Sequence, residues 1–174
     1  MSIVTKRGDG GKTDLWFADR VSKHHPQVET CGAIDEAKAA LGMARALAPE
    51  WLKPEILQIQ KHLYTASSEL ATLRGKADRL KERVGEELTG WADAQVVRYE
   101  KVIEITGWVI SGDSSAGASL DLALTMVRRG ERWAVRLRDE GYIENPHLLV
   151  FLNRLSDLLF LMARAADREV EVPA

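Results

Sequence analysis

The sequence predicts an all-α protein, a bundle of about five helices. Three observations favour this fold class. Apolar residues recur at spacings of three and four along several long segments, which is the period of a helix with one buried face. Proline and glycine residues separate those segments, and no alternating strand pattern of useful length is present. The length of 174 residues suits a single domain, 1–174, built around one core.

The first half of the chain predicts three helices. Residues 28–48 are rich in alanine and leucine and stop at Pro49, which cannot continue a helix. A second helix is expected over 54–73, where the apolar spacing suits antiparallel packing. The charged, glycine-punctuated stretch 74–90 is interpreted as a connector with room for a short helix. A third helix is expected over 92–107.

The second half predicts a loop and two longer helices. Residues 108–117 are rich in glycine and serine and are interpreted as a loop. A fourth helix is expected over 118–140. The fifth is expected over 146–169, because Asn145 followed by Pro146 is typical of a helix start.

The fifth helix carries four polar side chains inside an apolar stretch. Its core stripe is Leu148, Leu152, Leu155, Leu159 and Met162. Unsatisfied polar groups lose about 1–3 kcal/mol each when they are buried. We therefore expect a polar partner against this helix, whether another helix, a second subunit or a ligand. The four residues are Asn153, Arg154, Ser156 and Asp157.

The fourth helix places charges next to its core stripe. The stripe runs through Leu120, Leu124 and Val127, and Glu131 falls where it should continue to Ala134. Arg128 and Arg132 share one side of the helix, whereas Arg129 is expected to point farther outward. One interpretation is a surface network of ion pairs worth about 0.2–1 kcal/mol each. The other is a phosphate site, since arginine forks suit phosphate oxygens.

Residues 1–27 are rich in glycine, lysine and aspartate and carry no helical period. The stretch 5–13, TKRGDGGKT, resembles a phosphate-binding loop, because glycines let backbone N–H groups approach oxygens and lysines supply charge. It is not a Walker A motif, because Lys6 stands where the first glycine is required. Taken alone, the stretch is better interpreted as a flexible terminus than as a nucleotide site. Lys23 adds another cation.

Composition excludes several functions. A net charge of −2 argues against a broad nucleic-acid surface. A single cysteine, Cys31, allows neither an internal disulfide nor a cysteine-based zinc site. No apolar run reaches the ~20 residues that cross a bilayer. No signal-peptide pattern is present, so we expect a cytoplasmic protein without a membrane partner.

These segments together are similar to the PduO-type ATP:cob(I)alamin adenosyltransferases, and the similarity covers nearly the whole chain. It implies a five-helix up-and-down bundle with ferritin-like left-handed packing, assembled as a homotrimer with active sites between subunits. It rests on TKRGDGGKT (5–13), Lys23, CGAIDE (31–36), IQKHLYTASSELA (59–71), RRGER (128–132) and FLNRLSDLLFLMAR (151–164).

The resemblance implies transfer of the 5′-deoxyadenosyl group of ATP to the cobalt of cob(I)alamin, with release of triphosphate. Magnesium would be carried by ATP and not by a protein cage. An adenosylcobalamin-dependent enzyme would accept the product. Catalysis is assigned to Arg128, Arg132 and Asn153, and the 1–27 segment becomes a nucleotide-binding loop. The implied ATP contacts are Thr5, Lys6, Arg7, Gly8, Thr13, Asp14, Lys23, Arg128, Arg129, Glu131, Arg132 and Asn153.

The resemblance also assigns Trp108 to cobalamin, in the place where the family has a phenylalanine; a core or interface anchor is the alternative. The chain departs from the family around this residue. The family loop is Phe-x-x-Pro-Gly-Gly, whereas here the segment 108–113 is WVISGD. Asp121 and Leu124 replace a family histidine and arginine, and that arginine would pair with the aspartate matching Asp35.

These departures leave three readings of the function. The first is an active adenosyltransferase with an altered corrin-side loop. The second is a non-catalytic relative that binds ATP or cobalamin as an escort or sensor. The third is a purely structural helical trimer, which the cationic segments at both ends of the chain argue against.

Overall fold

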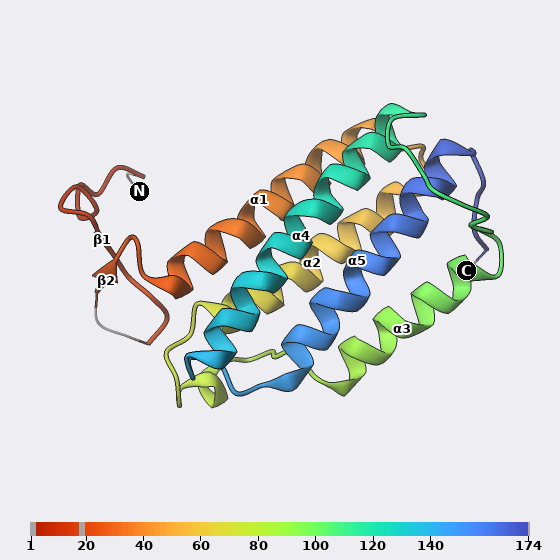
Figure 1. Cartoon of the computed structure of the whole chain (residues 1–174). Helices are drawn as coiled ribbons and strands as arrows, with labels where there is room; N and C mark the ends of the chain where they lie inside the picture. Colours follow the sequence, from red (N-terminus) through yellow and green to blue (C-terminus); the bar gives the residue numbers. More distant parts are fainter. Residues whose placement is uncertain (1–2, 18–19, 174) are drawn as a thin grey trace.

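The structure, a computed structural model, describes residues 3–17 and 20–173. The predicted five-helix bundle is confirmed in this part of the chain (Figure 1). A short 3-10 helix, η1, lies in the connector after the second helix, and two short strands pair antiparallel near the N-terminus. The elements are β1 (Lys12–Thr13), β2 (Val21–Ser22), α1 (Pro26–Leu47), α2 (Lys53–Leu70), η1 (Ala77–Arg79), α3 (Glu86–Glu100), α4 (Ser115–Asp139) and α5 (Pro146–Asp167).

The helices lie side by side, and α4 runs antiparallel to both α1 and α5 (Figure 1). Helix α1 packs against α2 and α4, and α5 packs against α4 and α3. The N-terminal segment with β1 and β2 projects beyond the start of α1. We call residues 3–17 and 20–25 the N-terminal arm. No helix in the described part of the chain is long and apolar enough to cross a membrane.

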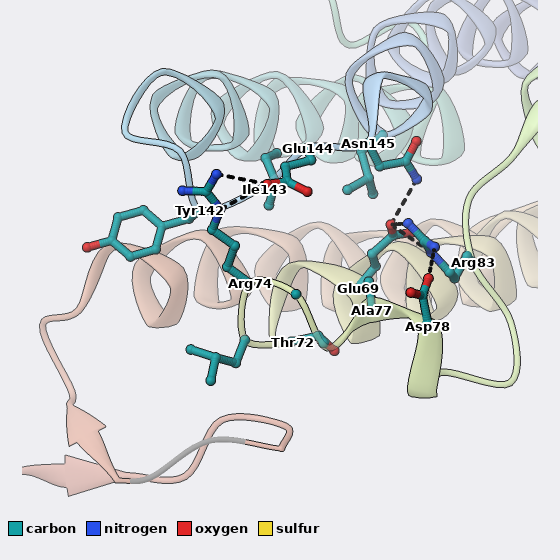
Figure 2. A pocket seen from close by; sticks show the side chains of 13 residues that line it. Glu69, Thr72, Arg74, Ala77, Asp78, Arg83, Tyr142, Ile143, Glu144 and Asn145 are labelled. Carbon is teal, nitrogen blue, oxygen red and sulfur yellow. Dashed lines mark hydrogen bonds and ion pairs between the residues drawn. The ribbon is translucent and has the colours of Figure 1, made fainter.

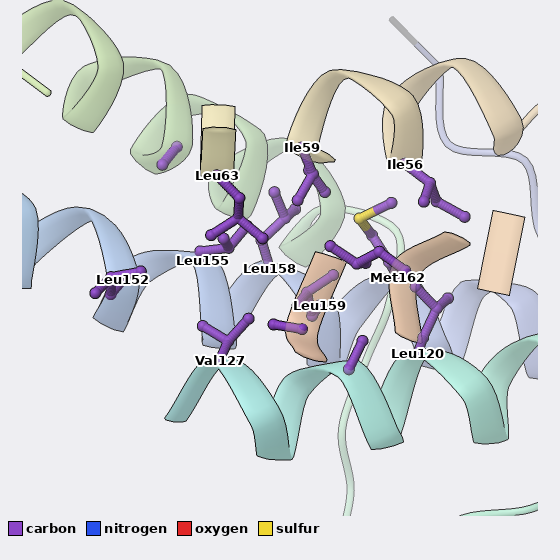
Figure 3. Packing of buried hydrophobic residues seen from close by; sticks show 14 of the residues in the cluster. Ile56, Ile59, Leu63, Leu120, Val127, Leu152, Leu155, Leu158, Leu159 and Met162 are labelled. Carbon is purple, nitrogen blue, oxygen red and sulfur yellow. The ribbon is translucent and has the colours of Figure 1, made fainter. Parts of the chain in front are cut away.

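All five helices contribute buried residues to one core, and Figure 3 shows the part of it where α2, α4 and α5 meet. The stripe predicted for the fifth helix is confirmed, because all five of its residues are fully buried. They meet Ile59 and Leu63 of α2 and Leu120 and Val127 of α4, which are also buried. Burying one such side chain stabilises the fold by about 1.5–3 kcal/mol.

Two predicted helix boundaries are wrong. Helix α3 covers Glu86–Glu100 and not 92–107; Gly85 precedes it and two glutamates occupy its first turn, where the helix dipole favours negative charge. Helix α2 ends at Leu70 and not at 73. The chain there turns to pair with Trp16, whose N–H donates to the Ala71 carbonyl at 3.0 Å. A long-range backbone contact therefore ends this helix.

The prediction that Glu131 interrupts the core stripe of the fourth helix is also wrong. Gly130 occupies the buried position, and Glu131 lies beside it, half-buried. A Cβ atom on Gly130 would lie 2.5 Å from Cδ1 of Ile34. The glycine therefore lets α4 approach α1 more closely than any other residue would allow.

The polar cluster of the fifth helix finds its partners inside the chain. The Arg154 guanidinium pairs with Asp93 of α3 and, at 3.0 Å, with Asp157. Its hydrogen bond to Asp93 raises the pKa of Arg154. The Ser156 hydroxyl donates to the Asn153 carbonyl at 2.9 Å. The expected polar partner is thus a neighbouring helix, α3, for Arg154, whereas Asp157 is paired with Arg154 of its own helix.

Where α2 ends and α5 begins, one buried carboxylate holds the connector (Figure 2). Glu69 is 4% exposed and accepts from the Val84 N–H at 3.0 Å and the Asn145 amide at 2.8 Å. Arg83 pairs with the same carboxylate at 3.3 Å. Asn145 also caps α5 by accepting from the His147 N–H at 3.0 Å. These bonds fix the connector on the bundle beside a cavity of about 110 Å³.

Candidate functional site

The N-terminal arm folds its glycine-rich stretch into tight turns. The Asp9 N–H donates to the Lys6 carbonyl at 3.3 Å, and the Gly11 N–H donates to the Gly8 carbonyl at 3.1 Å. Gly11 has a φ of +74°, which glycine adopts without strain. Lys6 has a φ of +56°, which is uncommon for a residue with a Cβ. The stretch predicted to bind phosphate is thus an ordered turn.

Arg20 organises this arm, and the sequence analysis did not find it. Its guanidinium donates to the carbonyls of Arg7 and, at 2.7 Å, Lys12. It also pairs with Asp14 at 3.5 Å, and Asp14 pairs in turn with Arg7 at 3.4 Å. Arg7 and Asp14, two predicted site residues, therefore lie together. No motif marks Arg20, because its partners are mostly backbone carbonyls.

The arm is tied to the bundle at its C-terminal end. Gln27 is fully buried, and its amide nitrogen donates to the carbonyls of Leu70 and Thr72, each at 2.9 Å. The Lys23 N–H donates to the Gly11 carbonyl at 2.9 Å, which joins the glycine turn to the approach to α1. Gln27 lies in the first turn of α1, so its bonds fix the start of α1 on the end of α2, and the Trp16 N–H ties the arm itself to Ala71.

Three predicted phosphate-binding residues gather where the arm meets α4. Lys23 and Arg129 line one cavity of about 230 Å³. A Cβ atom on Gly8 would lie 3.2 Å from the Lys23 Nζ atom, so the turn lies directly against that cation. Glu29 and Glu36 of α1 line the same cavity, and Glu36 forms an ion pair with Arg129. Glu36 is a second residue that the sequence analysis did not find.

The remaining α4 and α5 residues form a separate group. Arg128 and Arg132 are exposed, whereas Arg129 is half-buried against α1, so the prediction that Arg129 points farther outward is wrong. The Asn153 amide donates to the Glu131 carboxylate at 3.2 Å. Within one protomer, the structure thus joins Glu131 to Asn153 and, separately, Gly8 to Lys23 and Arg129. Thr5 and Lys6 are exposed, and Thr13 pairs with Val21 in the small sheet.

The segment that links α3 to α4 presents its apolar side chains to solvent. Trp108 is completely exposed, and Ile110 is 86% exposed. Trp108 is therefore not a core anchor of this protomer. Large exposed apolar groups next to one another are typical of surfaces that bind a ligand or another protein.

Asp35, Asp121 and Leu124, which the resemblance singled out, have defined environments. Asp35 is exposed and pairs with Lys38 at 2.8 Å. Asp121 is 8% exposed, and the Arg164 guanidinium donates to its Oδ2 atom at 2.6 Å. Leu124 is half-buried and packs against the core. Each of the two aspartates thus has a cation in its own chain.

The described residues offer no activated thiol and no protein metal cage. Burial, followed by the nearby charge of Asp35, raises the pKa of the Cys31 thiol to about 12, so this group stays protonated and unreactive at neutral pH. In residues 3–17 and 20–173, no three His, Cys, Asp or Glu side chains are grouped to hold a metal ion.

Comparison with known families gives one match along most of the chain. The sequence model of the family described as Cobalamin adenosyltransferase matches residues 3–166. The chain is 34% identical over 171 residues to Corrinoid adenosyltransferase PduO of Salmonella typhimurium. The aligned residues cover 97% of this chain and 51% of that relative. The chain thus spans about half the length of this relative.

Other relatives are of similar length to this chain. A Corrinoid adenosyltransferase of Citrobacter freundii is 34% identical over 183 residues, which cover 99% of this chain and 98% of that protein. Among solved structures, a variant PduO-type ATP:corrinoid adenosyltransferase from Lactobacillus reuteri, complexed with cobalamin and ATP, superposes with a TM-score of 0.88. It is 29% identical and covers 96% of this chain and 91% of its own.

Proposed function

The chain belongs to the cobalamin adenosyltransferase family, and on that premise we propose that it transfers the 5′-deoxyadenosyl group of ATP to the cobalt of cob(I)alamin. The products are adenosylcobalamin and triphosphate. The observation that carries the proposal is the contact of the glycine turn with Lys23, beside Arg129 of α4. Two cations at one cavity, one of them against the glycine turn, suit phosphate oxygens, and Glu29 and Glu36 of the same cavity balance their charge within this chain.

The reaction suits a site without a protein nucleophile. The reduced cobalt supplies the electron pair that attacks the 5′ carbon, and the bond from that carbon to the triphosphate oxygen breaks. The protein must hold the two substrates in line and stabilise charge on the departing triphosphate. Lysine and arginine side chains perform this second task, while the cofactor-type substrate supplies the reactivity.

We assign the phosphates to cations from both groups of the site. The arm contributes Lys6 and Lys23, next to which Arg129 of α4 lines the cavity. The exposed face of α4 contributes Arg128 and Arg132. Asn153, held by Glu131, completes the set with Thr5, Arg7, Gly8, Thr13 and Asp14. Magnesium arrives with ATP, since it commonly bridges phosphate oxygens.

We further propose a homotrimer with sites between subunits. The arm projects from its own bundle and carries exposed cations, and Arg128 and Arg132 face outward from α4. Such groups act on a buried triphosphate only if a second copy covers them. Trp108 and Ile110 would meet cobalamin at this junction. We place the protein in the cytoplasm, where ATP is available, and expect an adenosylcobalamin-dependent enzyme to receive the product.

A non-catalytic relative that binds ATP or cobalamin as an escort or sensor is the second candidate. The observation that favours it is Leu124, which cannot form an ion pair with the aspartate at position 35. Only the enzyme forms adenosylcobalamin, so a turnover test separates the two candidates, and a binding test shows whether the second would take ATP or cobalamin.

Heat stability in the presence of Mg-ATP tests the binding part of the proposal. At an ATP concentration about 100 times the dissociation constant, binding stabilises the protein by about 2.7 kcal/mol, which raises Tm by roughly 5–11 °C. We expect Arg128→Ala to lose most of this rise. The matched control is Arg136→Ala, an exposed arginine of the same helix that pairs with Glu140. Failure of Mg-ATP to raise the Tm of the unmutated protein would remove the enzyme and the ATP-binding form of the second candidate.

A further inference from the structure

The last turn of α5 carries a buried guanidinium between two carboxylates. Arg164 is 3% exposed, and it donates to Asp121 Oδ2 at 2.6 Å and to Asp167 Oδ2 at 3.0 Å. Asp121 belongs to α4, so the ion pairs join the two helices. The planar fork of an arginine fixes the direction of each bond, which a lysine would not do. The cluster therefore sets how the start of α4 lies on the end of α5.

The second carboxylate of this cluster holds the first turn of α4. The Ser114 hydroxyl donates to Asp167 Oδ1 at 2.8 Å and, as the N-cap of α4, accepts from the Gly117 N–H at 2.9 Å. A Cβ atom on Gly117 would lie 2.0 Å from Asp167 Oδ1 and 3.0 Å from the Ala163 carbonyl. The first turn of α4 thus rests on the backbone of α5, with no space for a side chain at Gly117.

The same turn of α5 also holds the other end of the exposed segment. The Arg168 guanidinium donates to the Glu104 carbonyl at 3.0 Å, and Ile103 beside it is buried. Both ends of the stretch 104–113 are therefore attached to residues 164–168. Between these two attachments, Trp108 and Ile110 stand in solvent. One helical turn fixes the base of the loop that presents the exposed tryptophan.

We propose that Arg164 and Asp121 are positioning residues: Asp121 orients the Arg164 guanidinium, and Arg164 orients the Asp167 carboxylate that binds Ser114, so that the 104–113 loop brings Trp108 to cobalamin. This inference rests on the proposed function, because it takes Trp108 as a cobalamin contact. Neither residue touches ATP or cobalamin; both act through the placement of the loop.

Asp121→Asn tests the proposal with little change of shape. Arg164 keeps its pair with Asp167, so the bundle is expected to fold. We expect the KM for cobalamin to rise about tenfold while the KM for ATP stays unchanged, because a misplaced contact weakens only its own substrate. Glu69→Gln is the matched control, a buried acidic group at the opposite end of α5. It is expected to lower Tm and leave both KM values unchanged.

A second measurement needs no turnover. Chymotrypsin cleaves after exposed aromatic residues when the chain around them can open locally. We expect cleavage after Trp108 to become at least about threefold faster in Asp121→Asn than in Glu69→Gln, at a temperature where both stay folded. In a Trp108→Ala background, Asp121→Asn should no longer change the KM for cobalamin.

The outcomes separate this proposal from the proposed function. An unmutated protein that makes adenosylcobalamin, with the same cobalamin KM in Asp121→Asn, overturns the positioning role and leaves the function standing. If the unmutated protein makes no adenosylcobalamin, the proposed adenosyl transfer is contradicted, and so is the proposed contact of the 104–113 loop with cobalamin. In that case, unchanged cleavage after Trp108 also shows that the cluster does not order the loop.

Discussion

A buried charged side chain lies at each end of α5, but the two charges fix different segments of the chain. At the N-terminal end, the carboxylate of Glu69 accepts hydrogen bonds from the connector and from Asn145. These bonds attach the connector to the helix bundle. At the C-terminal end, the guanidinium of Arg164 joins two carboxylates that support an exposed loop. The same class of interaction therefore stabilises the bundle at one end and presents apolar side chains to solvent at the other.

The contrast extends to what each end exposes. Near Glu69, Arg83 is 39% exposed, so part of the network already contacts water. Near Arg164, all three charged side chains are nearly inaccessible. A buried charge that loses its partner is costly, whereas a partly solvated one can turn to water. The C-terminal end should therefore respond far more strongly to substitution.

Replacing Arg164 should have the largest effect. Arg164→Leu leaves Asp121 and Asp167 buried without their cation, and we expect a loss of about 3–5 kcal/mol in the free energy of unfolding. Urea unfolding of the variant and the unmutated protein at pH 7 measures this loss. A change comparable to that of Glu69→Gln would show that the two ends do not differ.

Glycine substitutions sharpen the contrast further. Gly117→Ala forces a methyl group against Asp167 and the α5 backbone, and we expect it to destabilise the protein by about 1–3 kcal/mol. Gly90→Ala is the matched control, because Gly90 lies on an exposed face of α3 with no atom within 4 Å of the added Cβ. There the better helix propensity of alanine should stabilise by about 0.5–1 kcal/mol. Opposite signs of the two Tm shifts are the expected result.

At the other end, Glu69→Gln should cost less than the loss of Arg164. The glutamine amide keeps one acceptor oxygen, so either the Val84 N–H or the Asn145 amide loses its acceptor, while Arg83 can turn to water. We expect a loss of roughly 1–2 kcal/mol, below the cost of a fully buried unpaired charge. Calorimetric melting of the variant checks this value. A loss as large as that of Arg164→Leu would contradict the difference in solvation.

The smallest effect is a pH dependence from the middle of the bundle. His62 lies 4.4 Å from the Trp91 ring, centroid to centroid, and burial lowers its pKa from the ordinary value of 6.5. The folded protein thus favours neutral His62, and the unfolded chain binds a proton more readily. Stability is complete above about pH 6.5 and falls as the pH drops through the lowered pKa.

Urea midpoints between about pH 7.5 and 5.5 measure this dependence, and His62→Gln should flatten part of the acidic decline. Glutamine keeps a polar group beside Gln58 but takes up no proton in this range. An identical decline in the variant would assign the pH dependence to other groups.

The sequence predicts the middle of the bundle better than its ends. The α5 stripe follows from spacing alone, because burial requires only that apolar residues share one helix face. The end of α2 does not, since the pairing of Trp16 with residues 71–73 joins segments far apart in the chain. The stripe of α4 was misplaced by one residue because a buried glycine, Gly130, carries no hydrophobic signal.

The candidate site divides in the same way. The glycine turn and its cations are visible in the sequence because the residue types themselves suit phosphate. Arg20 and Glu36 are not, because they act on backbone carbonyls and on Arg129 through contacts that no local pattern encodes. The pairing of Asp121 with Arg164 spans 43 residues and likewise depends on how the helices pack.

The absorption spectrum of cob(I)alamin mixed anaerobically with this protein and Mg-ATP tests the central claim most directly. The proposed reaction predicts that the spectrum of adenosylcobalamin appears, with one triphosphate released for each cobalamin converted, and that Arg128→Ala slows the change strongly. A spectrum that stays that of reduced cobalamin, although Mg-ATP raises the Tm of the same sample, would contradict adenosyl transfer and leave a nucleotide-binding relative.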